Sequence, residues 1–368
     1  MKVLRFIKRN AVLCIATLAA IITSCIILPS AEYIGYFDFK TLSCLFITLA
    51  VICALKNIKF FTIVARRLIR LTGNLRTLAI LLVVITFIGS MIIANDMALI
   101  TFLPLGYFAF SVTGNDKHMA YMFILQNISA NLGGMLTPFG NPQNLYLYSA
   151  YDIPTGEFTL IMLKPFLLAV AMLIACCFVF KPEKLTIKDS FNEKLNIKRT
   201  VIYLALFAFS ILVVFRVIPY PIGLAVVFIA LLFIDREALK AVDYPLLLTF
   251  VMFFIFAGNM SRIEAVNNLL SSLLEKSTLL VSIASCQFIS NVPSAILLSR
   301  FTDNYRELLL GVNIGGTGTL ISSLASLITF SEFRLLYPGQ GKKYILLFAL
   351  MNAIFLGVLT AATFFLFK

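Results

Sequence analysis

Two stretches of the sequence place glycines beside amide or hydroxyl side chains within otherwise apolar surroundings. The first break, as we call it, runs from Asn131 to Asn144 (NLGGMLTPFGNPQN), and the second break runs from Asn313 to Ser323 (NIGGTGTLISS). In hydrocarbon every backbone N–H and C=O needs a partner within the protein, so a helix breaks at mid-depth only inside protein or against a water-filled cavity. Paired breaks of this kind form the binding sites of secondary transporters. The two stretches therefore predict a site that binds a solute.

The first break contains both the residues that would unwind a helix and the residues that would bind a solute. Gly133 and Gly134 permit unwinding, and Pro138 and Pro142 stop the helix from re-forming. The alternative for paired glycines is close helix packing through small residues. The candidate solute ligands here are Thr137, Asn141, Gln143 and Asn144.

The second break has a different chemistry from the first. Gly315, Gly316 and Gly318 permit unwinding, but no proline enforces it. Its candidate solute ligands are the hydroxyls of Thr317 and Thr319. We therefore expect the first break to be the more rigid wall of the site.

Each break is preceded by an apolar segment with a polar tip at its centre. Residues 77–111 are interrupted at Asn95, and residues 277–301 are interrupted at Ser290 and Asn291. Each arm of the first segment is short for a membrane span, which favours a re-entrant hairpin. The N–H groups that begin the second arm carry partial positive charge and favour an anion, while carbonyl oxygens suit sodium. Asn95, Ser290 and Asn291 are therefore further candidate solute ligands.

Asp96 is the only acid that the sequence places deep within an apolar run. An intramembrane carboxylate is a functional candidate by default, here for binding a cation or carrying a proton. The alternative is that Asp96 caps the second hairpin arm, and the two roles can coexist. The ion-coupling candidates are Asp96, Asn95, Asn131, Gly134, Asn291, Asn313 and Gly316, with sodium at the hairpin tips and helix breaks.

Signals for enzymatic chemistry are weak. Neither glycine-rich break fits a dinucleotide fingerprint or a P-loop, and no HExxH is present. The seven cysteines lie in apolar runs without CxxC spacing, so neither a disulfide frame nor a zinc site is indicated. We expect no catalytic residues and no cofactor, with sodium or a proton as the coupling ion.

Composition places the chain in a membrane. Apolar residues make up 61% of its 368 residues, charged residues make up 13%, and the mean hydropathy is +0.99. The net charge of +13 comes from Lys and Arg in loops between apolar spans, as the positive-inside rule predicts. The expected partners are a small solute or ion and membrane lipids, and nucleic acid is not expected.

The pattern of spans predicts an all-α membrane protein with about nine spanning helices, two re-entrant hairpins and two helices broken at mid-membrane. A cytoplasmic N-terminus puts most Lys and Arg inside, the C-terminus outside and the hairpins on opposite sides, which is an inverted-repeat arrangement. The basic N-terminal residues and the apolar run after them favour a retained first helix over a cleaved signal peptide.

The predicted parts are a first repeat, 1–180, with hairpin 77–111 and broken helix 119–151; a cytoplasmic linker, 181–199; and a second repeat, 200–368, with an extra helix 200–217, hairpin 277–301 and broken helix 306–336.

The segments ANLGGMLTPFGNPQNL, SNVPSAILLS and NIGGTGTLISS resemble the citrate-transporter-like permeases of the ion transporter superfamily. That group includes divalent anion/sodium symporters, arsenite permeases and sodium/proton antiporters, and the resemblance covers nearly the whole chain. It implies two inverted repeats, each with a scaffold part and a transport part. It also implies a bacterial-type inner membrane protein, often a homodimer whose transport parts move as elevators.

The hairpin tips depart from the symporter pattern. In that branch both tips carry Ser-Asn-Thr, which contacts the substrate carboxylate, whereas here Val292 follows Asn291, and Ala94 and Asp96 flank Asn95. These departures make a di- or tricarboxylate a less favoured substrate, and Asp96 favours proton coupling or a cationic substrate. We expect a secondary transporter that moves a small anion, a carboxylate or inorganic oxyanion, by alternating access with a sodium or proton gradient. The alternatives are a sodium/proton antiporter that uses Asp96 and, less favoured, an ion channel.

Overall fold

The computed structural model describes residues 10–185 and 193–366, and within these ranges the elements are helices with one isolated β-bridge. Seven of these helices are long and apolar enough to cross a membrane. They are α3 (Phe39–Asn57), α5 (Leu75–Ile93), α6 (Asn95–Val112), α9 (Thr155–Cys177), α10 (Ile197–Val214), α13 (Tyr244–Ser261) and α19 (Gly341–Phe365). The prediction of an all-α membrane protein is confirmed.

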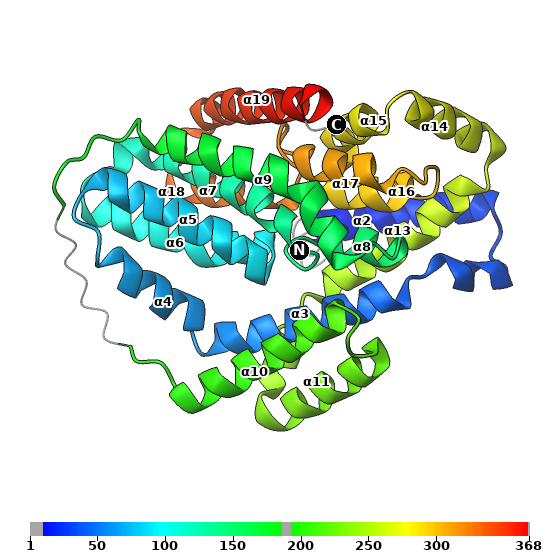
Figure 1. The fold of residues 1–368 in the computed structure, drawn as a ribbon, viewed down its shortest axis with the longest axis horizontal. Helices are drawn as coiled ribbons and strands as arrows, with labels where there is room; N and C mark the ends of the chain where they lie inside the picture. Colours follow the sequence, from blue (N-terminus) through cyan, green and yellow to red (C-terminus); the bar gives the residue numbers. More distant parts are fainter. Residues whose placement is uncertain (1–9, 186–192, 367–368) are drawn as a thin grey trace.

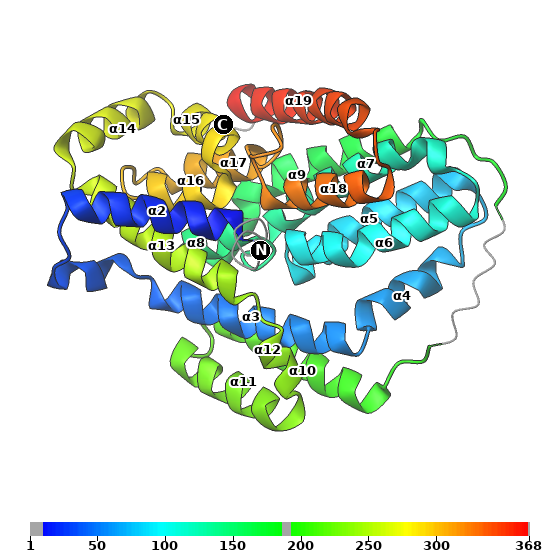
Figure 2. The same ribbon diagram turned by 180° about the vertical axis from the view of Figure 1, so that it is seen from behind.

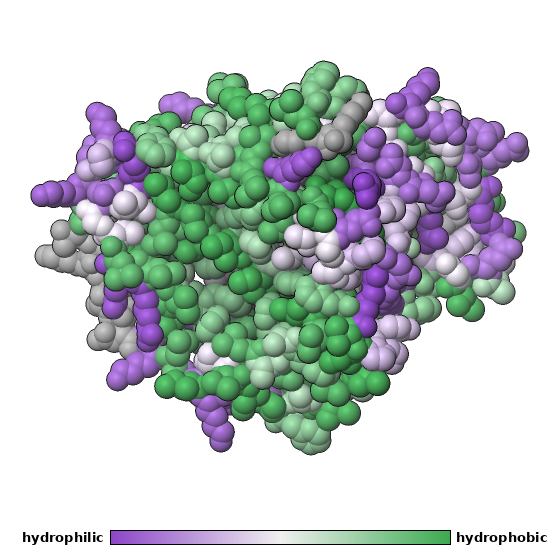
Figure 3. All heavy atoms as spheres, viewed as in Figure 1, coloured by the Kyte–Doolittle hydropathy of each residue, from purple (hydrophilic) through white to green (hydrophobic). Residues whose placement is uncertain are grey.

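Most helices lie along the long axis of the molecule, so their ends collect at its two extremities (Figure 1). Hydrophilic residues cluster at these extremities, and a broad apolar belt lies between them (Figure 3). This is the distribution that a bilayer requires, since the belt faces lipid and the charged ends face water. The chain is therefore an integral membrane protein.

The shorter elements complete the fold and include the broken helices. The two segments that contain the breaks, 119–151 and 306–336, are each divided into two α-helices, in agreement with the prediction. The shorter helices are α2 (Ala11–Ile26), η1 (Ala31–Tyr36), α4 (Phe60–Ile69), η2 (Asp116–His118), α7 (Met119–Gly133), η3 (Gly134–Leu136), α8 (Pro142–Ala150), α11 (Tyr220–Ile234), α12 (Arg236–Lys240), α14 (Glu264–Lys276), α15 (Thr278–Ile289), α16 (Asn291–Leu298), α17 (Tyr305–Ile314) and α18 (Leu324–Leu336).

The two hairpins differ in length. In the first hairpin, α5 has 19 residues and α6 has 18, so each arm is about 28 Å long at 1.5 Å per residue. These arms are longer than the sequence suggested, because the polar tip interrupts the helix only at Ala94. In the second hairpin, α15 has 12 residues and α16 has eight.

The helices of each break pack against the other half of the chain. α18 lies against α6 and α7, and α8 lies against α16 and α17. Outside these helices, α3 packs on α10 and α11, and α2 packs on α13 (Figures 1 and 2). The breaks are therefore enclosed by helices from both halves.

The predicted linker lies beside the base of the first hairpin. Leu75 N donates to Glu183 O at 3.0 Å, and Leu185 N donates to Gly73 O at 3.0 Å. α10 begins at Ile197, inside the predicted linker range. Residues 186–192 of the linker, the N-terminal residues 1–9 and residues 367–368 lie outside the described residues, including several basic residues on which the orientation prediction rests.

Candidate functional site

The tips of the two hairpins have the same backbone geometry. Ala94 has φ 64° and ψ 153°, and Ser290 has φ 74° and ψ 162°, in a region that residues other than glycine rarely adopt. In each case the following asparagine accepts a bond at Oδ1 from the next backbone N–H, from Asp96 N to Asn95 at 3.0 Å and from Val292 N to Asn291 at 2.9 Å. Each asparagine thus satisfies one of the free N–H groups at the start of its own helix.

Both tips contact a helix break through hydrogen bonds. Nδ2 of Asn95 donates to Oδ1 of Asn131 at 3.2 Å. At the second tip, the backbone N–H of Asn291 donates to Ser322 O at 3.0 Å, and the Ser290 hydroxyl donates to the same carbonyl at 3.3 Å. The first tip therefore lies on the first break, and the second tip lies on the second.

The two breaks are bonded to each other through the asparagines of their N-x-Gly-Gly motifs. Oδ1 of Asn131 accepts a bond from the hydroxyl of Ser323, the N-cap of α18, at 2.7 Å. Oδ1 of Asn313 accepts a bond of 3.5 Å from Asn141, the N-cap of α8. Nδ2 of Asn313 also donates to Oδ1 of Asn144 at 2.6 Å. Each motif asparagine therefore contacts the residue that begins a helix in the other half.

We refer to this connected set as the break network. It links the N-termini of four helices, α6, α8, α16 and α18, through buried side chains and the backbone carbonyls of Asn131 and Ser322. The N-terminus of a helix carries unsatisfied N–H groups and partial positive charge, so it attracts anions. The members of the break network are Asn95, Asn131, Asn141, Asn144, Asn291, Asn313, Ser322 and Ser323.

Four buried side-chain atoms in or beside the break network have no hydrogen-bond partner in the protein. They are Asp96 Oδ1, Asn131 Nδ2, Asn141 Oδ1 and Gln143 Oε1. Buried polar atoms are normally paired, so these four are free to bond to a ligand, an ion or a water molecule. Three of the four are oxygens, which are the ligands that hard cations prefer. No group of three or more His, Cys, Asp and Glu that could bind a metal occurs within 10–185 and 193–366.

The capping alternative for Asp96 does not describe the structure. Ala94 is the N-cap of α6 and provides no side-chain bond, and the Asp96 backbone N–H is satisfied by Asn95. Oδ1 of Asp96 is buried without a partner. The carboxylate is therefore available for an ion or a proton.

Glycines allow the closest approaches within the site. A Cβ added to Gly134 would lie 2.3 Å from Oδ1 of Asn141, and a Cβ added to Gly316 would lie 3.1 Å from Nδ2 of Asn291. A heavy atom at 2.3 Å cannot be accommodated without a shift. Gly134 is therefore required by the packing of the first break. At position 316 a Cβ would fit only if the Asn291 side chain moved slightly.

The predicted threonine ligands bond to backbone within their own halves. The Thr137 hydroxyl donates to Met91 O at 2.9 Å, and the Thr319 hydroxyl donates to Gln287 O at 3.0 Å. The Thr317 hydroxyl donates to Ile314 O at 2.7 Å. None of these three side chains has a bond to the break network, and Thr319 is exposed.

Several polar contacts at the site were missed in the sequence. Asn127, one helical turn before Asn131, donates to the hydroxyl of Ser326 at 3.3 Å and adds a further link between the halves. Gln287 bonds to three backbone groups of the second break. The helical spacing of Asn127 from Asn131 could have indicated the first contact, but nothing local marks Gln287.

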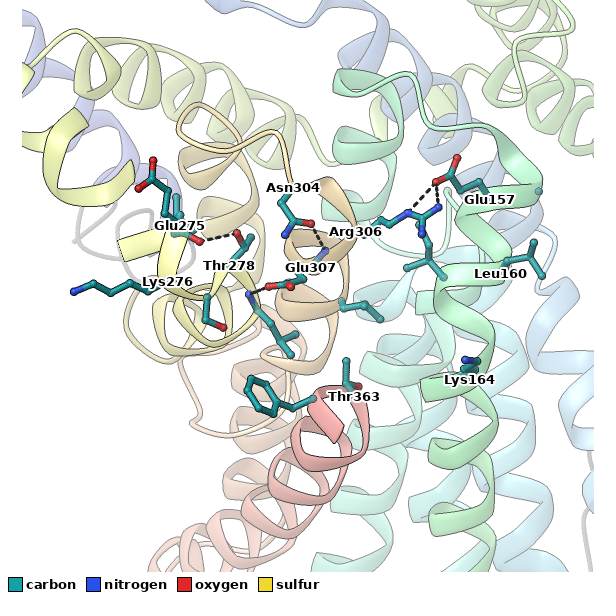
Figure 4. Close-up of a pocket in the computed structure, with 17 residues that line it drawn as sticks. Glu157, Leu160, Lys164, Glu275, Lys276, Thr278, Asn304, Arg306, Glu307 and Thr363 are labelled. Carbon is teal, nitrogen blue, oxygen red and sulfur yellow. Dashed lines mark hydrogen bonds and ion pairs between the residues drawn. The ribbon is translucent and has the colours of Figure 1, made fainter. Parts of the chain in front are cut away.

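A large cavity of about 1060 Å³ lies away from the break network, between α9, α15, α17 and α19 (Figure 4). Lys164 lines it, and Arg306 pairs there with Glu157 at 2.7 Å. Oε2 of Glu307 accepts a bond from Leu279 N, at the start of α15, at 2.9 Å. None of the predicted site residues lines this cavity, so it is separate from the candidate site.

Comparison with known proteins identifies the family. A family model described as "Citrate transporter" matches residues 3–305, which include both hairpins and the first break. The chain is 32% identical over 311 residues to the uncharacterized transporter MJ0456 of Methanocaldococcus jannaschii, covering 82% of this chain and 83% of that protein. It is 28% identical over 276 residues to the inner membrane protein YbiR of Escherichia coli, covering 73% of each. The chain therefore belongs to the citrate transporter family.

Proposed function

We propose that the protein is a secondary active transporter that moves a small anionic solute, a carboxylate or an inorganic oxyanion, by alternating access. Membership in a citrate transporter family supports a secondary transporter. The observation that carries the choice of an anion is the meeting of four helix N-termini in the break network. The proposed solute ligands are Asn95, Asn141, Asn144, Ser290 and Asn291, together with the unpartnered amide oxygen of Gln143.

Coupling would use a sodium ion or a proton at the same place. The buried, unpartnered oxygens of Asp96 and Asn141 support a cation beside the anion. Asn131, Asn313 and the two close-packed glycines Gly134 and Gly316 would hold the backbone around it. A cation bound there would also offset the charge of the solute.

Matched geometry in the two halves supports an arrangement of two related repeats. The tips share one backbone conformation, and Thr137 and Thr319 each donate to the carbonyl four residues before a tip asparagine. The inversion of the repeats, their division into scaffold and transport parts, and assembly into a homodimer remain expectations of the resemblance. Crosslinking in native membranes, followed by electrophoresis, would test the dimer.

Uptake into proteoliposomes tests the proposal. Purified protein would be reconstituted and offered labelled citrate, succinate, sulfate and phosphate, with sodium or proton gradients imposed separately. We expect saturable accumulation of at least one anion that depends on one of the two gradients. Flux that does not saturate and continues at channel rates would contradict a carrier.

The second candidate is a sodium/proton antiporter, which the unpartnered carboxylate oxygen of Asp96 favours. The same vesicles, loaded with a pH-sensitive dye, distinguish the two. Proton movement driven by sodium, without accumulation of any anion in the panel, would support the antiporter and exclude the symporter.

The protein would lie in an inner membrane with its N-terminus in the cytoplasm and its C-terminus outside. The excess of Lys and Arg in the loops assigned to the cytoplasm supports this orientation. The relative YbiR is named as an inner membrane protein. Alkaline phosphatase fused after residue 368 should be active, and the same enzyme fused in the 181–199 linker should be inactive.

A further inference from the structure

Gln287 lies in the second hairpin, one helical turn before the tip, and its side chain bonds to the unwound backbone of the second break. Nε2 donates to Gly315 O at 2.9 Å and to Thr317 O at 3.2 Å. Oε1 accepts from Thr319 N at 2.9 Å. One side chain thus satisfies three backbone groups that an unbroken helix would have satisfied itself.

The break is shaped to receive this side chain. Gly318 has φ +125°, a conformation that residues with a Cβ rarely adopt, and a Cβ there would lie 2.2 Å from Oε1 of Gln287. The amide therefore lies directly against the backbone of Gly318. Both the conformation and the contact require glycine at this position.

The first half solves the same problem in another way. The position that matches Gln287, four residues before the tip asparagine, is Met91, whose thioether cannot donate a hydrogen bond. There Nδ2 of Asn144, within the break itself, bonds to Gly134 O at 3.0 Å and to Thr137 O at 3.4 Å. Two prolines also keep that segment unwound. The second break has no proline, and its one amide, Asn313, donates to Asn144 Oδ1 and Leu309 O and not to the unwound backbone. The amide that bonds to this backbone therefore comes from the hairpin.

The second break is also the more open of the two. Phe139 of the first break packs against Phe207 and Phe215 of α10, with ring centroids 6.4 and 6.0 Å apart. In the second break Ile321 is 54% exposed, and Phe288 beside Gln287 is 78% exposed. The Ser322 hydroxyl bonds within this segment, to Gly316 O at 2.9 Å and to Thr319 O at 2.8 Å. From outside the segment, the hydrogen bonds of Gln287 fix Gly315 O, Thr317 O and Thr319 N.

We infer that Gln287 is a positioning residue for transport, which holds the second break in the form that binds solute and makes it move together with the second hairpin. This inference rests on the proposed function. The contact of Gln287 with the break affects the tip, because the tip also bonds to the break. Asn291 N and the Ser290 hydroxyl both donate to Ser322 O. Without the amide of Gln287, segment 315–322 would sample other conformations, and the tip would lose a fixed partner.

The variant Gln287→Met, which introduces the residue found at the matching position of the first half, tests the inference. If the competent form falls to a tenth of the population, the apparent KM for the transported anion rises about tenfold while kcat stays near that of the wild type, because saturating solute restores the bound form. Labelled citrate, succinate, sulfate and phosphate would be the probes. Gln287→Glu keeps an acceptor for Thr319 N but loses the bonds donated to Gly315 O and Thr317 O, and it should shift KM in the same direction.

Gln126→Met is the matched control. Gln126 is fully buried and donates to the Thr86 hydroxyl at 3.1 Å and to Phe102 O at 3.0 Å, without contacting either break backbone. This change should lower the thermal stability and leave KM per folded protein unchanged. It separates loss of a buried amide in general from loss of the contact with the second break.

Hydrogen exchange of peptides that cover 315–322 gives a readout independent of transport. Gln287→Met should raise exchange there at least tenfold relative to the wild type, and Gln126→Met should not. Unchanged exchange, or unchanged KM in folded Gln287→Met protein, would overturn the inference. If the wild type accumulates none of the four anions, the proposed function fails, while the exchange experiment still decides whether Gln287 holds the break.

Discussion

Asn131 and Ser323 form a hydrogen bond of 2.7 Å between Oδ1 and the serine hydroxyl, although 192 residues separate them in the chain. Ser323 also begins α18, where its hydroxyl accepts a bond from Ala325 N at 3.2 Å. One hydroxyl therefore caps a helix of the second half and binds the N-x-Gly-Gly asparagine of the first. The geometry of the site depends on both halves at this bond.

Ser323→Ala should impair both stability and transport. Loss of an N-cap hydroxyl costs about 1 kcal/mol, and Oδ1 of Asn131 would lose a buried partner. The temperature of thermal unfolding and the rate of anion uptake should both fall. Ser277→Ala is the control, because Ser277 caps α15 through Leu280 N at 3.3 Å without a bond to the other half. Equal loss of transport in both variants would show that the contact with Asn131 has no special role.

Gly134→Ala should disrupt the first break. The new methyl group would lie 2.3 Å from Oδ1 of Asn141 and 2.7 Å from Gly140 O, and relief of such overpacking typically costs about 1–3 kcal/mol. The expected result is a lower unfolding temperature with little or no uptake. Gly357→Ala, in α19, meets nothing within 4 Å and should be neutral or stabilising by up to about 1 kcal/mol. Normal uptake by Gly134→Ala would argue against a fixed first break.

Asn291→Ala should weaken solute binding through the second tip. A hydrogen bond to a charged group is worth about 1.5–3 kcal/mol, so KM should rise roughly 10- to 150-fold. Asn115→Ala removes another largely buried amide, which bonds to Thr113 O at 3.0 Å in a loop, and should leave KM unchanged. If Asn291→Ala retains wild-type kinetics and ion dependence in folded protein, the second tip is not part of the site.

Asp96→Asn should uncouple transport from the driving ion. The amide keeps the shape of the side chain but carries no charge and takes up no proton near neutral pH. We expect the dependence of uptake on the sodium or proton gradient to disappear, with the folded fraction retained because Oδ1 has no partner in the protein to lose. Gradient dependence equal to that of the wild type would exclude Asp96 as the coupling residue.

The sequence located the breaks well because their signals are local. Gly133, Pro138 and Pro142 act on the backbone at their own positions, and the structure interrupts the helix there. The sequence pattern predicts short arms for the first hairpin, because polar Asn95 and Asp96 interrupt the apolar run, but the helix itself is interrupted only at Ala94. Ala94 alone makes the turn, and helix resumes at Asn95.

The contacts within the site could not be predicted because they join residues far apart in the chain. Asn313 and Asn144 were each proposed as polar candidates, but their bond spans 169 residues. Thr319 was expected to bind solute, whereas its hydroxyl bonds to Gln287 O in the preceding hairpin. Gln287 could not be identified from the sequence either. Its role depends on its contact with the unwound backbone of the second break, and no local pattern indicates that contact.

The packing of α10 on Phe139 has an energetic consequence for a carrier that alternates between two open states. If the two halves are inverted repeats, as the resemblance implies, identical surroundings would make the inward-open and outward-open states equal in free energy. Phe207 and Phe215 cover one break, and Ile321 of the other is left exposed. Because the two breaks are packed differently, the two states of such a carrier would differ in free energy, and the empty protein would favour one of them even without a gradient.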